Sequence, residues 1–155
     1  MKKIMIKIGE FLFKYRNHAF PLYILALFLI FMPPSYFLGT SGIQTTVAVI
    51  VAFLGLAMRW IVIGLAYIKR GGLNKKVYAG NLVTEGMFSL CRNPLYVGNM
   101  LIYAGEFLMF GNFICFLIGV LSFWFIYECI IATEENYLQN KFGAEYNEYC
   151  KNVPR

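Results

Sequence analysis

The chain has 155 residues, of which 59% are hydrophobic and only 14% are charged, and its mean hydropathy is +0.61. Soluble domains carry about a quarter charged residues, so this composition excludes an ordinary soluble domain and indicates a protein whose solvent is the bilayer. The net charge of +6 does not require a nucleic-acid partner, because most Lys and Arg residues flank apolar segments, where positive charge sets membrane orientation. We expect a single membrane domain over residues 1–155, with membrane lipids and no nucleic acid as partners.

The first segment, residues 1–18, has the pattern of an amphipathic helix. Ile4, Ile8, Phe11 and Tyr15 recur at steps of four, three and four, and the lysines lie elsewhere on the helix surface. This pattern suits a helix that lies on an anionic membrane surface. The alternative is a charged leader that only precedes the first membrane span.

Four apolar segments follow, and they predict about four transmembrane helices. Pro33-Pro34 lies late in the first of them and predicts a break or kink there. Gly111-Asn112 separates the last two and predicts a tight turn, so these two segments form a helical hairpin. The predicted fold is therefore an all-α integral membrane protein with spans at residues 20–38, 44–68, 94–110 and 113–132 and a cytosolic C-terminal segment at 133–155.

The positions of the basic residues predict the topology. Lys and Arg precede the first span, follow the second and recur near the C-terminus, whereas the short connection after the first span and the turn at Gly111-Asn112 carry none. The positive-inside rule then places both termini in the cytoplasm, in a multi-pass protein of the cell membrane. Residues 82–92 and 134–155 would lie on the same cytoplasmic face.

Three ionisable residues, Arg59, Glu106 and Glu128, fall inside the predicted spans. A charge at membrane depth costs at least about 2.5–3.5 kcal/mol on insertion scales, so it usually faces protein or a water-filled cavity. We expect Arg59 to line a polar cavity and to pair with one of the two glutamates, of which Glu128 is better placed. The alternative is a buried ion pair that only fixes helix packing.

The remaining polar groups concentrate at two places. The chain has no Asp and a single His, His18, so we expect neither a His-based triad nor a metal site. Arg92-Asn93-Pro94 begins the third span, where free backbone N–H groups at a helix start would suit a ligand carboxylate. Glu134-Glu135 lie at the exit of the fourth span, and two adjacent carboxylates indicate either solvation or a cationic or hydroxyl-bearing ligand. Taken without further information, Arg92 could equally reach the membrane interface and the two glutamates could be a solvated helix end.

Three ordered motifs resemble the isoprenylcysteine carboxyl methyltransferase and phospholipid methyltransferase family. They are LVTEGMF at 82–88, RNPLYVG at 92–98, and the spaced residues that run from Glu134-Glu135 to Val153-Pro154-Arg155. Arg59-Trp60 is also similar to an element of that family. The resemblance implies an integral membrane enzyme that binds S-adenosylmethionine near the cytoplasmic face, partly inside a helical bundle.

The resemblance also implies roles for individual residues. Together with the placement of the charged residues, it leads us to expect Arg92 and Glu134 as the catalytic residues and Arg59 and Glu128 on the substrate side. The cofactor contacts that it implies are Gly80, Asn81, Leu82, Val83, Phe88, Asn93, Pro94, Leu95, Tyr96, Glu134 and Glu135.

The chain departs from the family at a few positions. Phe88 stands where the family usually has Tyr, and Asn93 stands where it most often has His, so a role that needs an imidazole is not available. Ile130 occupies the place of an Arg that eukaryotic members use for the prenylcysteine substrate, and the G-x-G element of phosphatidylethanolamine methyltransferases is missing. These differences argue against simply carrying over either substrate.

The resemblance predicts transfer of a methyl group to a lipidic or isoprenoid-linked acceptor that enters sideways from the bilayer. The acceptor group could be a carboxylate, an amine or a thiol. Two alternatives stay open: an NADPH-dependent membrane reductase of the steroid-reductase kind, and a small membrane scaffold without enzymatic activity.

Overall fold

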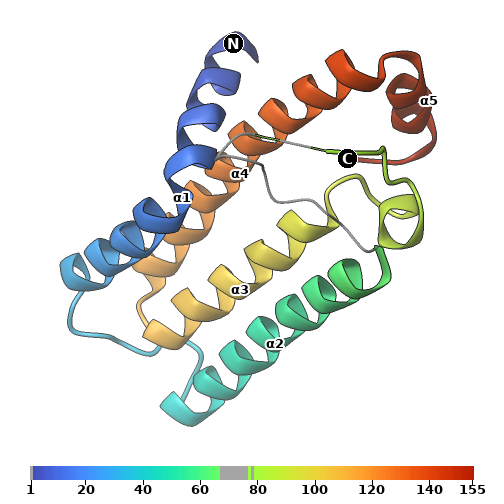
Figure 1. The fold of residues 1–155 in the computed structure, drawn as a ribbon. Coiled ribbons are helices and arrows are strands. Elements are labelled where there is room, and N and C mark those ends of the chain that lie inside the picture. Colours follow the sequence, from blue (N-terminus) through green and yellow to red (C-terminus); the bar gives the residue numbers. More distant parts are fainter. Residues whose placement is uncertain (1, 67–76, 78) are drawn as a thin grey trace.

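A computed structural model describes residues 2–66, 77 and 79–155 of the chain, and every regular element among them is helical. Figure 1 shows the arrangement of these helices. The five α-helices are α1 (Lys2–Ile30), α2 (Ser41–Ala66), α3 (Pro94–Phe110), α4 (Phe113–Phe142) and α5 (Ala144–Asn152), and a short 3-10 helix, η1, spans Gly86–Ser89. The all-α prediction is confirmed.

Two of these helices, at Ser41–Gly64 and Phe113–Phe142, are long and apolar enough to cross a membrane. Both coincide with predicted spans, whereas α3 has only 17 residues and α1 carries many charges. Within the described residues the structure thus supports two of the four predicted spans by length and composition.

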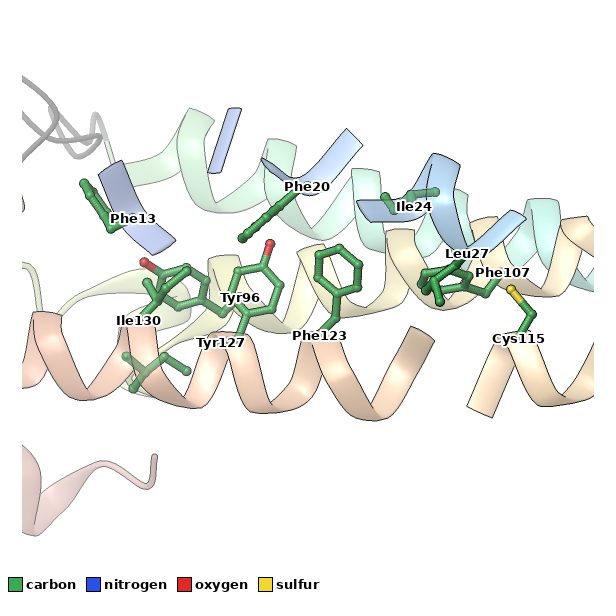
Figure 2. Close-up of a cluster of buried hydrophobic side chains, with 11 residues drawn as sticks. Phe13, Phe20, Ile24, Leu27, Tyr96, Phe107, Cys115, Phe123, Tyr127 and Ile130 are labelled. Atoms are coloured by element: carbon green, nitrogen blue, oxygen red, sulfur yellow. The ribbon is translucent and has the colours of Figure 1, made fainter. Parts of the chain in front are cut away.

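Helix α1 differs most from its prediction. We predicted a surface helix at residues 1–18 and a separate span at 20–38, but one continuous helix covers Lys2–Ile30. The reason is a stripe of buried side chains, Phe13, Phe20, Ile24 and Leu27, which packs toward α4 on both sides of residue 19 (Figure 2). Tertiary packing of one apolar face therefore carries the helix through the predicted boundary. The predicted break at Pro33-Pro34 is confirmed, since α1 ends three residues earlier.

The hairpin between α3 and α4 forms as predicted. Pro94 occupies the first turn of α3, and Gly111 ends the helix with φ of +83°, a conformation that glycine adopts without steric cost. The side chain of Asn112 then caps α4 by accepting a hydrogen bond from the backbone N–H of Cys115 at 3.1 Å. This turn brings the start of α3 and the distant end of α4 to the same end of the bundle.

Helices α2 and α3 pack at very short range. A Cβ atom added at Gly55 would lie 2.6 Å from the carbonyl oxygen of Gly98, and one added at Gly105 would lie 2.7 Å from the carbonyl oxygen of Ala48. Small residues of this kind allow the backbones of membrane helices to approach closely. The tight α2–α3 contact fixes Arg59 against the N-terminal half of α3.

Candidate functional site

A cavity of about 540 Å³ lies between α1, α2, α3 and α4 and is closed on one side by Phe88 of η1. Its volume falls within the range of about 300–1,000 Å³ that small-molecule sites occupy. Aromatic rings form much of its wall, and Figure 2 shows Phe20 of α1 facing Phe123 and Tyr127 of α4. The polar and tyrosine side chains that line it are Arg16, Asn17, Arg59, Asn93, Tyr96, Asn99, Tyr103, Tyr127 and Glu134.

The structure brings together part of the predicted site. Six predicted residues from α2, η1, α3 and α4 line the cavity: Arg59, Phe88, Asn93, Leu95, Tyr96 and Glu134. Phe88 is 1% exposed, and its carbonyl oxygen accepts a 2.7 Å hydrogen bond from the Tyr149 hydroxyl of α5. Segments some forty residues apart in sequence therefore meet at one cavity, as the hairpin predicts.

Asn93 is the most informative of these residues. It is the N-cap of α3, yet its side chain forms no capping hydrogen bond. Its amide nitrogen Nδ2 is buried and has no hydrogen-bond partner among the described residues. A buried donor without a partner is costly and rare in native proteins, so this position fits a ligand acceptor atom at the cavity wall.

Glu134 and Glu135 point in different directions, because adjacent residues of a helix are about 100° apart. Glu134 lines the cavity, whereas the Glu135 carboxylate pairs with Arg92 at 3.2 Å and with Arg155 at 3.3 Å. Each glutamate thus has its own surroundings. The two guanidinium groups around Glu135 reduce the repulsion between the Glu134 and Glu135 carboxylates.

Arg92 lies outside the cavity lining, although we expected it beside a ligand carboxylate. Its guanidinium contacts Glu135 and donates to Cys150 Sγ at 3.1 Å, and its backbone N–H donates to the carbonyl of Pro154 at 2.9 Å. Burial alone would lower the pKa of Arg92, but Glu135 and Cys150 outweigh it and the pKa is raised. Arg92 therefore joins the start of α3 to α4 and to the end of the chain.

The predicted contacts at Gly80–Val83 also lie outside the lining of the cavity. The Lys141 ammonium donates to the carbonyls of Ala79 and Gly80, and Leu82 packs on the buried cluster formed by α5 and the end of α4. The same holds for Pro94, which is buried at the start of α3. This segment is placed beside the cavity by α4 and α5 instead of forming its wall.

The predicted partner of Arg59 is wrong. The Arg59 guanidinium donates to the side-chain oxygen of Asn99 on α3, and Glu128 pairs instead with Arg155 at 3.0 Å. Tyr127 lines the cavity, so the next residue along the helix, Glu128, is turned away from it. The expectation that Arg59 lines a polar cavity is confirmed.

Sequence reasoning missed the contribution of α1 and of the middle of α3. Arg16 and Asn17 line the cavity, but we predicted that residues 1–18 form a surface helix or a charged leader, without a part in the site. A signal for α3 was present, since Tyr96, Asn99, Tyr103 and Glu106 follow one another at steps of three, four and three and so share one helix face.

A second hollow of about 380 Å³ adjoins the cavity between α1 and α3. Both share Phe20, Pro21 and Tyr103, and the second continues along the helices to Phe28 and Glu106. We call this second hollow the α1–α3 groove. It is largely apolar, and it extends the cavity from the level of Tyr103 toward the opposite end of the bundle.

The arrangement suits the binding of two ligands, one polar and one partly apolar. At one end, Asn93 offers a hydrogen-bond donor and Glu134 a carboxylate beside the rings of Phe88 and Tyr96. At the other end, an apolar groove opens between two helices. A polar molecule and an amphiphile could therefore meet in the cavity, away from bulk water.

Comparison with known proteins finds similarity to one family over the middle of the chain. Residues 71–145 match the family described as phospholipid methyltransferase. The chain is 40% identical over 73 residues to the protein-S-isoprenylcysteine O-methyltransferase of Schizosaccharomyces pombe, a match that covers 47% of this chain and 31% of the relative. It is 31% identical over 128 residues to protein-S-isoprenylcysteine O-methyltransferase B of Arabidopsis thaliana, covering 70% of this chain and 65% of the relative.

A relative whose name indicates a different role is also similar. The cobalt-zinc-cadmium resistance protein CzcN of Cupriavidus metallidurans is 38% identical over 73 residues, covering 47% of this chain and 33% of the relative. The chain thus spans between about a third and two thirds of the length of these three relatives. No solved structure matches it significantly.

Proposed function

Because residues 71–145 match the phospholipid methyltransferase family, we propose that this protein is a membrane methyltransferase that uses S-adenosylmethionine as methyl donor. The single observation that carries the proposal is the cavity in which Phe88, Asn93, Tyr96 and Glu134 meet from two separate stretches of the chain. These residues lie at the positions where the family resemblance places cofactor contacts.

The residues present fit this cofactor. The unpartnered Nδ2 of Asn93 can donate a hydrogen bond to the cofactor carboxylate or to a ribose hydroxyl. The Glu134 carboxylate can accept from ribose hydroxyls or from the amino group, and the rings of Phe88 and Tyr96 can hold the adenine or the methyl region. When bound, the cofactor supplies a methyl group on a sulfonium, which is transferred by in-line displacement.

The chain's own contribution to such a reaction is alignment. A carboxylate acceptor needs no base, and an amine or thiol needs only to lose a proton, so the protein must chiefly hold the reacting atoms in line and exclude water. Arg92 would act as a positioning residue, because its contacts hold Asn93 and the C-terminal segment in place without reaching the cavity. We propose that the cofactor enters from the cytoplasmic side, with both chain termini there, and that the acceptor enters from the bilayer.

Cofactor titration tests this proposal. Purified protein in nanodiscs is titrated by calorimetry with S-adenosylmethionine and, separately, with NADPH. We expect binding of the first only, and Glu134→Gln weakens it whereas Glu145→Gln, which removes a carboxylate exposed on α5, does not. Binding of NADPH alone would assign the protein to the reductases, and binding of neither would favour a scaffold.

The acceptor is then identified chemically. Membranes from the source cells are incubated with the protein and a radiolabelled methyl donor, and the labelled product is extracted and analysed. Incorporation into a lipid fraction is the expected result. Label found only in water-soluble products would refute the lipidic acceptor.

A further inference from the structure

The aromatic contacts fix the register of α1 against α3. The rings of Phe20 and Tyr103 lie 6.3 Å apart, and those of Phe28 and Phe110 are stacked at 4.3 Å. The two helices therefore run in the same direction, and residues about one turn before Phe20 and Tyr103 lie at a common level. Arg16 of α1 is thus level with Asn99 of α3, as expected from their shared place in the cavity lining.

Arg59 reaches the same level from α2, because its guanidinium donates to the side chain of Asn99. Two guanidinium groups, Arg16 and Arg59, consequently line one cavity from different helices. The guanidinium of Arg16 is held 4.3 Å from the ring centre of Phe13, a residue that is buried and also lines the cavity.

Neither arginine forms an ion pair with any carboxylate in the part of the chain that the structure describes. Among the described residues that line the cavity, Glu134 is the one carboxylate, and it lies seven positions beyond Tyr127 on α4, which corresponds to about 10 Å of helix. Tyr127 contacts Tyr96 and Tyr103 near the level of the two arginines. Positive charge therefore gathers in the middle of the cavity and the carboxylate at its cytosolic end.

Arg16 and Arg59 are both half-buried, and an anion bound between two guanidinium groups would relieve their mutual repulsion. Guanidinium groups suit carboxylate and phosphate oxygens in particular, because their planar donors match those acceptors two at a time. The α1–α3 groove begins directly beside this pair. It is lined by apolar side chains, including Ile24, Leu25 and Phe28, and by one carboxyl group, that of Glu106.

We propose that Arg16 and Arg59 bind the acidic head group of an amphiphile whose hydrocarbon tail occupies the α1–α3 groove. This inference rests on the proposed function, since the amphiphile would be the methyl acceptor, and Arg16 would be the residue that selects its charge. An acceptor with a cationic head group is repelled by the same pair. The cofactor's own carboxylate is assigned to the Asn93 end, about one to two helical turns closer to the cytosol.

The test measures head-group selectivity directly. Binding of radiolabelled palmitate to nanodisc-reconstituted protein is followed by scintillation proximity, with competition by hexadecyl phosphate, hexadecylamine and methyl palmitate, which share one tail length. We expect palmitate to bind and the amine and the ester to compete at least about tenfold more weakly than unlabelled palmitate. Competition by hexadecyl phosphate as strong as that by palmitate would assign the site to acidic head groups in general, and weaker competition would assign it to carboxylates.

Variants then locate the head group. Arg16→Gln lowers palmitate affinity by about tenfold or more, Arg16→Lys restores part of it, and Lys14→Gln changes it less than about twofold. Lys14→Gln is the matched control because it removes one positive charge from the exposed side of the same helix. Equal effects of Arg16→Gln and Lys14→Gln, or competition by hexadecylamine as strong as by palmitate, would overturn the proposal.

Titration with S-adenosylmethionine separates this inference from the proposed function. Arg16→Gln should bind the cofactor with unchanged affinity, and a parallel loss of cofactor and palmitate affinity would mean that the arginines hold the cofactor instead. Palmitate binding that depends on Arg16 in a protein without affinity for S-adenosylmethionine would support the head-group site and refute the methyltransferase.

Discussion

Replacement of Asn93 by Ala should have opposite effects on the stability of the free protein and on its affinity for the cofactor. The backbone carbonyl of Asn93 accepts from the N–H groups of Tyr96 and Val97 at 3.0 and 3.3 Å, and Ala keeps both bonds. Loss of an N-cap side chain usually costs about 0.5–2 kcal/mol. That cost does not apply here, because the Asn93 side chain makes no capping hydrogen bond.

The stability effect follows from the buried Nδ2 of Asn93. A buried donor without a partner carries a desolvation cost of about 1–3 kcal/mol, and Ala removes the donor. Some packing contact of the side chain is lost at the same time. We therefore expect the unfolding free energy of the ligand-free protein to stay the same or to rise by about 1 kcal/mol.

The affinity effect has the other sign. A hydrogen bond to a charged group contributes about 1.5–3 kcal/mol, and a factor of ten in affinity corresponds to 1.4 kcal/mol, so Asn93→Ala should weaken S-adenosylmethionine binding by about 10- to 150-fold. Calorimetry gives the affinity and thermal unfolding in nanodiscs gives the stability. Asn147→Ala, at an exposed position of α5, is the control and should change neither quantity. A destabilised Asn93→Ala protein with wild-type cofactor affinity would refute the reasoning, because Asn93 would then be a structural cap.

Three further predictions concern the frame around the cavity. Gly105→Ala should lower the unfolding free energy by about 1–3 kcal/mol through a clash with the backbone of α2, whereas Gly64→Ala, which meets no atom within 4 Å, should leave thermal stability unchanged or slightly raise it. Arg92→Ala should lower the free energy of local unfolding of α5 by about 1–2 kcal/mol, because Glu135, which is 19% exposed, keeps only Arg155 as a partner. Faster hydrogen exchange in α5 would show this, and unchanged exchange would contradict it. Burial and the nearby Glu135 raise the pKa of Tyr146, so its contribution to stability is present below about pH 10 and is lost as the pH rises further. The free energy of unfolding, measured between pH 8 and 11, should decline less steeply with pH for Tyr146→Phe than for the wild type. Identical slopes would contradict the assignment.

The elements predicted well are those that local residues determine. Pro94 suits the first turn of a helix, and Gly111-Asn112 provides both a left-handed glycine and a capping side chain, so both ends of α3 follow from nearby sequence. The end of α1 before Pro33-Pro34 has the same local origin. By contrast, the continuity of α1 through residue 19 depends on packing against α4, which begins 94 residues later in the sequence.

The same distinction divides the candidate site. The meeting of the 86–98 segment with Glu134 follows from one short turn, and the sequence contains that turn. Which charges pair depends on helix rotation, and a difference of one position decides it: Tyr127 faces the cavity, while Glu128 turns away and meets Arg155. Arg16 was not predicted because its level relative to Asn99 is set by ring contacts between helices that are distant in sequence.

The division of the cavity between chain segments bears on what the acceptor can be. Phe88, Asn93, Tyr96 and Glu134 lie within the matched region, residues 71–145, whereas Arg16, Arg59 and the α1 wall of the groove lie outside it. If cofactor binding resides in the shared region and acceptor selection in α1 and α2, relatives can keep one methyl donor while differing in what they methylate. In that case the acceptor is better inferred from the charge and shape of the α1–α3 side of the cavity than from the names of relatives.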